Sequence, residues 1–162
     1  METVYVATSL SNIENARTLV KALEDCGMRI TYKWQDLGAV TMDRYREISV
    51  PELNGVIEAR TFIGLLPGKK GTQTEIGAAL AAKQIWEALG NGVGDPSLTR
   101  RVFLYAAEET AFNEGVVGSD NYPSVFWHHP SVERIIGEDM VTAVINKLVD
   151  TRVLDANLRV AM

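Results

Sequence analysis

The chain has 162 residues, of which 46% are hydrophobic and 23% are charged. These values are typical of a globular protein that buries one core, and they argue against the low-complexity and fibrous classes. Twenty-one acidic residues against sixteen basic ones give a net charge of −5, which argues against nucleic acid and anionic membranes as partners. We expect one domain over residues 1–150, followed by a tail over 151–162.

The chain has a single cysteine, Cys26, which cannot form an internal disulfide and has no companion at metal-ligand spacing. We interpret Cys26 as a small packing residue, with a reactive thiol as the alternative. No run of about 18 apolar residues is present, and residues 1–3 lead into a strand without a basic leader. These features predict a cytoplasmic protein that does not span a membrane and has no metal site.

The chain alternates β-rich runs with helical patterns. Residues 4–7 are β-rich, and Ser11 to Glu14 fits a capping box at the start of a helix that Gly27 ends. The run 61–66 is almost continuously apolar, as in a strand that helices cover on both faces. The predicted strands are residues 4–7, 29–34, 61–66, 102–106 and 124–128. The first predicted helix starts after position 11, and three more span residues 43–59 (with Pro51 as a break or start), 74–89 and 139–149.

This alternation predicts a parallel sheet, because parallel strands need crossover connections and these are usually helices. The fold class is therefore α/β, a three-layer, doubly wound sheet of five mostly parallel strands of the flavodoxin or Rossmann type. Ligands in such folds bind beyond the carboxyl ends of the strands. The loops 8–11 and 67–74 should then face one crevice, whereas the polar segment 108–122 should be a surface loop.

The most informative segment runs from Pro67 to Leu80. An apolar strand ends there in a loop with Gly68, Gly71 and two lysines, and a helix follows. Backbone N–H groups at a helix N-terminus favour an anionic or sugar-like ligand. Glu75 has two interpretations at this point: it closes a capping box that begins at Thr72, or it acts on the ligand.

The segment 67–77 resembles the loop and helix start of the nucleoside 2-deoxyribosyltransferase family, which includes hydrolases that remove the base from nucleoside 5′-monophosphates. The similarity extends to residues 4–9 and 52–56 and covers residues 3–90 in order. The resemblance implies an enzyme that cleaves the N-glycosidic bond of a (deoxy)nucleoside or its 5′-monophosphate without a cofactor or metal. It also implies a homodimer or larger assembly.

The resemblance assigns roles to individual residues. Glu75 matches the nucleophile that attacks C1′ of the sugar, giving a covalent glycosyl intermediate that water or a second base resolves. An oxocarbenium-like transition state needs a carboxylate beneath the anomeric carbon. Glu52 falls where the family has an aspartate that positions the sugar or assists departure of the base. The expected substrate-binding residues are Tyr5, Thr8, Ser9, Gly68, Lys69, Gly71 and Thr72.

Lys69 departs from the family's pattern, in which transferases have an aspartate for the 5′-hydroxyl and monophosphate-cleaving relatives have a serine. A cation there can pair with a phosphate, which favours a 5′-phosphorylated substrate. The neighbouring Lys70 leaves a second explanation open, namely a loop that is simply basic.

Two other interpretations remain open. The segment 67–75 is also similar to the Pro-Gly-Gly-x-Gly-Thr-x-x-Glu signature of the cytokinin-activating phosphoribohydrolases, with Lys69 in place of the second glycine. Their other Gly-rich motif is not found after the first predicted strand. A catalytically silent nucleotide-sensing module on the same fold is the alternative function, because Glu52 and Lys69 depart from the family's residues.

A few further side chains are candidates for the crevice. Trp34, Asp36 and Asp43 follow the second predicted strand, where Trp34 could stack on a base, although surface or packing roles are equally compatible. Tyr5 is either a ligand contact or a core aromatic residue. His128 and the adjacent His129 would face opposite sides of a strand, so they cannot act as a simple pair.

Overall fold

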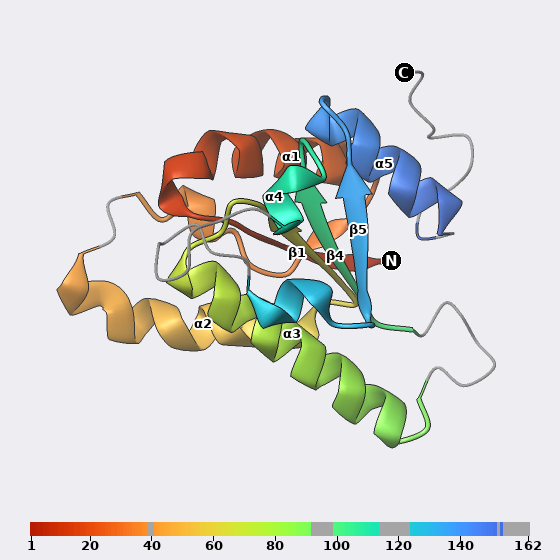
Figure 1. Ribbon diagram of the computed structural model, residues 1–162. Coiled ribbons are helices and arrows are strands. Elements are labelled where there is room, and N and C mark those ends of the chain that lie inside the picture. Colours follow the sequence, from red (N-terminus) through yellow and green to blue (C-terminus); the bar gives the residue numbers. More distant parts are fainter. Residues whose placement is uncertain (39–40, 92–98, 114–123, 152, 154–162) are drawn as a thin grey trace.

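The computed structural model describes residues 1–38, 41–91, 99–113, 124–151 and 153. Five strands form one sheet in the order β2-β1-β3-β4-β5, and every neighbouring pair is parallel. Helices α1 and α5 cover one face and α2 and α3 the other, which is the expected three-layer, doubly wound α/β fold (Figure 1). The strands are β1 (Thr3–Ala7), β2 (Arg29–Ile30), β3 (Thr61–Leu65), β4 (Arg101–Ala106) and β5 (Val132–Ile136), and the α-helices are α1 (Ile13–Asp25), α2 (Tyr45–Glu58), α3 (Lys70–Ala88), α4 (Thr110–Asn113) and α5 (Met140–Asp150).

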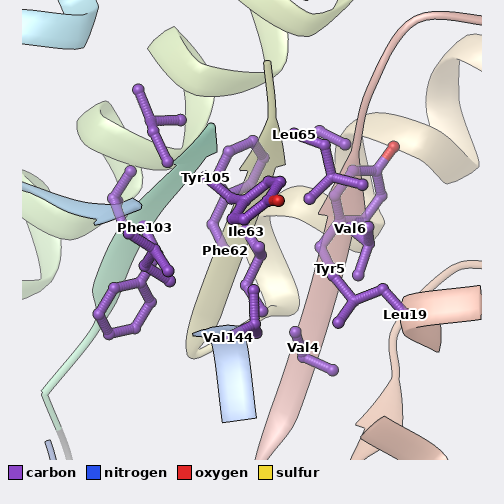
Figure 2. Close-up of a cluster of buried hydrophobic side chains, with 14 of the residues drawn as sticks. Val4, Tyr5, Val6, Leu19, Phe62, Ile63, Leu65, Phe103, Tyr105 and Val144 are labelled. Carbon is purple, nitrogen blue, oxygen red and sulfur yellow. The ribbon is translucent and has the colours of Figure 1, made fainter. Parts of the chain in front are cut away.

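The central strand β3 explains the apolar run in the sequence. All of its residues are buried, and it pairs with β1 on one side and β4 on the other. Helices cover both faces, so neither set of alternating side chains meets water. Figure 2 shows the core that results, in which side chains of β1, β3 and β4 lie with Leu19 of α1 and Val144 of α5.

Helix α1 is amphipathic and ends as expected. Its buried residues between Ala16 and Leu23 recur on the side that packs on the core. Gly27 follows with φ of +82°, a left-handed conformation that glycine adopts at little cost. The predicted capping box is wrong, because Ser11 lies in the short 3-10 helix η1 (Leu10–Asn12), and its hydroxyl pairs with that of Ser9 at 2.9 Å.

The second strand is shorter than the predicted 29–34. Thr31 N still donates to the carbonyl oxygen of Val4, but the chain then leaves the sheet and forms the 3-10 helix η2 (Trp34–Asp36). The next carbonyl on this edge of β1, that of Val6, accepts the indole Nε1–H of Trp34 at 2.7 Å. A side chain therefore replaces the backbone donor that a longer β2 would supply.

The predicted fifth strand at 124–128 is wrong, because this segment forms the 3-10 helix η5 (Val125–His128). The hydroxyl of Ser124 accepts the N–H of Phe126 and stabilises the turn. Trp127 is buried and donates its Nε1–H to Oε1 of Gln73 at 3.0 Å, which ties η5 to α3. The fifth strand is instead β5, where the charged Glu133 and Arg134 interrupt the apolar pattern.

The remaining predicted helices are present with shifted bounds. Asp139 precedes α5 and accepts the N–H of Thr142 through its Oδ1 at 2.7 Å, which makes it an N-cap. Helix α2 continues through Pro51, where we expected a break or a start, and the 3-10 helix η3 (Met42–Arg44) leads into it. Helix α3 begins at Lys70 instead of position 74.

Two predicted regions fall only partly within the described residues. The expected loop 108–122 contains α4, and its residues 114–122 lie outside the described part, as does most of the tail 151–162. Cys26 packs against the core, in agreement with its interpretation as a packing residue. Among the described residues, no helix combines the length and the apolar character needed to cross a membrane.

Candidate active site

A cavity of about 700 Å³ lies beyond the carboxyl ends of β1 and β3. The connections from these two strands lead to helices on opposite faces of the sheet, which is the point at which doubly wound folds bind ligands. The two loops expected to share a crevice do line this one cavity. Its lining residues are Thr8, Ser9, Leu10, Ser11, Trp34, Leu37, Tyr45, Ile48, Ser49, Glu52, Lys69, Lys70, Gly71, Thr72 and Glu75.

Glu75 is held by a tyrosine from the sheet. The hydroxyl of Tyr5, a fully buried residue of β1, donates to Oε1 of Glu75 at 2.5 Å. Burial raises the pKa of Glu75 to about 7, the bond from Tyr5 opposes this rise, and the charge of Glu52 adds to it. Burial and the nearby Glu75 also raise the pKa of Tyr5. Near neutral pH the Glu75 carboxyl is therefore poised between its neutral and ionised forms.

The structure contradicts the interpretation of Glu75 as part of a capping box. Helix α3 begins at Lys70 with Lys69 as its N-cap, so Thr72 and Glu75 both lie inside the helix. The Lys69 side chain makes no capping hydrogen bond. The Glu75 side chain reaches Tyr5 instead, which leaves it available to a ligand in the cavity.

The first turn of α3 presents polar groups to the cavity. Gln73 N donates to the carbonyl oxygen of Lys69 at 3.0 Å, so the N–H groups of residues 70–72 precede the first hydrogen bond of the helix. Thr72 is only 2% exposed, and its Oγ1 has no hydrogen-bond partner among the described residues. Buried hydroxyls are normally bonded, so this one is a natural donor to a ligand.

Gly68 shapes the same loop without lining the cavity. A Cβ at this position would lie 2.6 Å from Cγ2 of Thr72, which is too close for any side chain. Glycine is therefore required for the loop to pass over Thr72.

Glu52 supplies a second carboxyl from α2. It lines the same cavity, and burial raises its pKa. Its charge also raises the pKa of Glu75, so the two carboxyls are electrostatically coupled. Two carboxyls with raised pKa values in one cavity hold protons more readily than exposed carboxyls do and can transfer them to and from a ligand.

Part of the cavity lining is apolar. Trp34 is 7% exposed, and its bond to Val6 fixes the indole. Leu37 follows it, and Tyr45 and Ile48 add apolar surface from α2. A planar aromatic group can pack on such a surface.

The predicted site residues divide into two groups. Lining residues are Thr8, Ser9, Glu52, Lys69, Gly71, Thr72 and Glu75. Tyr5 and Gly68 do not line the cavity, but they contact Glu75 and Thr72. The hydroxyl of Thr8 is engaged within the protein, because it donates to the carbonyl oxygen of Leu65 at 3.0 Å and accepts from Asn12.

Sequence reasoning missed the contribution of α2 beyond Glu52. Tyr45, Ile48, Ser49 and Glu52 follow one another at helical spacing and share one face of α2. This periodicity around Glu52 is the signal that could have identified them.

Other candidates lie elsewhere. Asp36 and Asp43 are not among the lining residues, and neither are the two histidines. Nδ1 of His128 pairs with Arg134, and Nε2 of His129 with Gln84. Within the described ranges, no group of three or more His, Cys, Asp or Glu side chains is arranged to hold a metal ion.

Comparison with known proteins identifies a solved structure with the same fold. No protein-family model matches the sequence, and no curated protein matches it either. The structure is similar to that of the CMP N-glycosidase BcmB from Clostridium botulinum, with a TM-score of 0.53 and 20% sequence identity over 91% of this chain and 97% of the other. At this identity the similarity establishes the shared fold.

Proposed function

We propose that this protein cleaves the N-glycosidic bond of a nucleoside 5′-monophosphate, or of the corresponding (deoxy)nucleoside, through a covalent bond between Glu75 and C1′ of the sugar. The observation that carries the proposal is the buried Glu75 carboxyl, held by the Tyr5 hydroxyl at the wall of a cavity in the ligand-binding position of the fold. The resemblance of residues 67–77 to the deoxyribosyltransferase family supports the same chemistry. The shared fold with a CMP N-glycosidase supports it as well.

In the first step, the ionised Glu75 attacks C1′ while the bond from C1′ to the base nitrogen breaks and its electron pair leaves on the base. Tyr5 donates to Oε1, which leaves Oε2 for the new bond. Glu52 protonates the departing base, because its raised pKa lets it hold a proton more readily than an exposed glutamate does.

In the second step, water or a second base attacks C1′ on the face opposite the Glu75 ester and regenerates the carboxylate. With water, the attacking oxygen loses its proton to the Glu52 carboxylate and the outcome is hydrolysis. With a second base, the attacking nitrogen loses its proton to the same carboxylate and the sugar is transferred. Two displacements at one carbon retain its configuration in both cases.

The first turn of α3 supports a 5′-phosphate on the substrate. Lys69 and Lys70 supply positive charge beside the N–H groups of the helix start, and the Thr72 hydroxyl offers a further donor. We assign Lys69 the direct ion pair with the phosphate. The base would then pack on the apolar part of the lining at Trp34.

We propose self-association through α2. Val50, Leu53 and Ile57 are 61%, 45% and 44% exposed and lie on one side of the helix. Such a stripe on the surface favours burial against another protein surface, and a second copy of this chain is the occupant that the family resemblance supports.

The test is release of free base from a panel of ribo- and deoxyribonucleosides and their 5′-monophosphates, with and without an acceptor base. Glu75→Gln removes the nucleophile but keeps the shape of the side chain, and Glu87→Gln near the end of α3 is the matched control. We expect base release by the wild type and by Glu87→Gln, and a loss of at least about 10³-fold in Glu75→Gln.

Absence of base release from the whole panel would overturn the enzymatic proposal, and nucleotide binding without turnover would favour the sensing module. Full activity of Glu75→Gln would overturn the assigned nucleophile. An acceptor base that speeds sugar transfer separates transfer from hydrolysis.

A further inference from the structure

Gly55 of α2 is buried against two tyrosines, and a side chain does not fit there. A Cβ at this position would lie 2.6 Å from Cβ of Tyr32 and 3.2 Å from both Cδ2 and Cε2 of Tyr5. Rotating a side chain cannot relieve the shorter contact, because the Cβ of Tyr32 is attached directly to the backbone. Even alanine at position 55 therefore forces α2 or the backbone at Tyr32 to move, and it also lies closer to the Tyr5 ring than an ordinary contact.

The helix is tied to the sheet at this point. The hydroxyl of Thr31 donates to the carbonyl oxygen of Gly55 at 2.7 Å and lies 3.3 Å from that of Val4 on β1. The N–H of Thr31 also donates to Val4 O at 2.9 Å. These bonds hold Thr31, the neighbour of Tyr32, against both α2 and β1. We therefore expect the Tyr5 ring to take up part of any added volume.

Neighbouring side chains confine the Tyr5 ring. It is fully buried and stacks with Phe62, its register partner on β3, with ring centroids 6.0 Å apart and planes 8° from parallel. Its hydroxyl lies 2.5 Å from Oε1 of Glu75. A displacement of the ring by a few tenths of an ångström would lengthen or misalign this bond.

We infer that Gly55 is a positioning residue: by having no side chain, it lets the Tyr5 ring lie against α2 in the position from which its hydroxyl bonds to Glu75. The catalytic consequence rests on the proposed role of Glu75, whereas the positioning itself does not. The same glycine sets the approach to β1 of the helix that carries Glu52. Gly55 acts through Tyr5 and does not touch the substrate.

The test is an NMR titration of the Glu75 side-chain carboxyl in Gly55→Ala, with the resonance assigned by its loss in Glu75→Gln. We expect the titration midpoint to rise by about half to one pH unit, because a hydrogen bond to the ionised form is weakened. Tyr5→Phe should raise the midpoint at least as much, and adding Gly55→Ala to it should raise it no further. The other titratable groups that line the cavity, Tyr45, Glu52, Lys69 and Lys70, are unchanged in these variants.

Gly137→Ala is the matched control, because a Cβ there would lie 2.9 Å from Cβ of Ala143, next to β5 and away from Glu75. It should lower the stability without moving the Glu75 midpoint. If Gly55→Ala does not fold, Phe62→Leu loosens the same ring without adding volume and should raise the midpoint in the same direction.

A wild-type midpoint in Gly55→Ala, or in Phe62→Leu if the former does not fold, would overturn the inference. An equal shift in Gly137→Ala would overturn it too, because it would then reflect stability alone. Full base-releasing activity of Glu75→Gln would instead overturn the proposed function and leave the positioning of Tyr5 intact.

Discussion

Tyr5 and Glu75 are 70 positions apart in the sequence, yet the tyrosine hydroxyl donates to Oε1 of the glutamate at 2.5 Å. The bond joins β1 to α3 at the cavity. It lowers the pKa of Glu75, whereas burial and the charge of Glu52 raise it, with a result of about 7. Opposing influences of the surroundings thus set the proton affinity of the proposed nucleophile.

Tyr5→Phe should shift the pH dependence of base release. The nucleophile must be ionised, so wild-type kcat/KM should rise with pH through about 7. Without the tyrosine hydroxyl the pKa of Glu75 is higher, so this limb should move to higher pH. Tyr105→Phe, which loses a partly buried bond to the carbonyl oxygen of Gly137, is the control and should keep the wild-type limb. An unmoved limb in Tyr5→Phe would contradict the role of the bond.

Glu75→Gln should stabilise the protein at alkaline pH. The pKa of Glu75 is about 7 in the folded protein against an ordinary value of 4.5, so the folded state binds this proton more tightly. The stabilisation from this proton is complete at pH values below the pKa of Glu75 in the unfolded chain. It is lost as the pH rises through the pKa of Glu75 in the folded protein. We expect glutamine to add about 2–3 kcal/mol to the free energy of unfolding at pH 8, and far less near pH 4. Urea denaturation at both pH values measures this, and a difference that does not depend on pH would refute it.

Lys69→Met should weaken binding of phosphorylated substrates selectively. Loss of a charge-assisted pair is worth about 1.5–3 kcal/mol, so KM for 5′-monophosphates should rise at least about tenfold while that for nucleosides stays near wild type. Steady-state kinetics on matched pairs of substrates measures the effect. Lys70→Met is the comparison, and an equal loss in both variants would mean that the loop is simply basic.

Trp34→Phe should destabilise the protein while keeping an aromatic ring at the cavity. The variant loses the donor to the carbonyl oxygen of Val6, which is then left without this partner at the sheet edge. The expected loss is about 1–3 kcal/mol in the free energy of unfolding, measured by urea denaturation. Unchanged stability would show that water replaces the indole without cost.

Leu53→Glu should weaken self-association, because it places a charge in the exposed apolar stripe of α2. Sedimentation velocity over a range of protein concentrations measures the shift toward monomer. Ile136→Glu on β5 is the control, since Ile136 is 46% exposed and Leu53 45%. Association that survives Leu53→Glu would exclude this surface.

The fold was largely predictable because its signals are local. The apolar run of β3 and the glycine that ends α1 carry their structural meaning in adjacent residues. The C-terminal part was harder, since the run at 125–128 has the composition of a strand, and only the Ser124 cap and the burial of Trp127 make it a 3-10 helix. The real fifth strand, β5, was not predicted because Glu133 and Arg134 interrupt its apolar pattern.

The candidate site was predictable where it follows strand ends and hidden where it depends on packing. Thr8, Ser9 and Lys69 follow strands whose carboxyl ends must meet at one edge. Tyr45 and Ile48 come from a helix, and its rotation over the sheet is fixed by long-range contacts. The restriction at Gly55 likewise exists only once Tyr5 and Tyr32 are brought beside it.

The bond between Trp34 and Val6 also bears on how this sheet avoids aggregation. Strand β2 is an edge strand of two residues, and an edge with free carbonyls can recruit a strand from another chain. The indole occupies the acceptor that lies just beyond the short strand. Addition of a strand from another chain to this exposed stretch of β1 is thereby disfavoured.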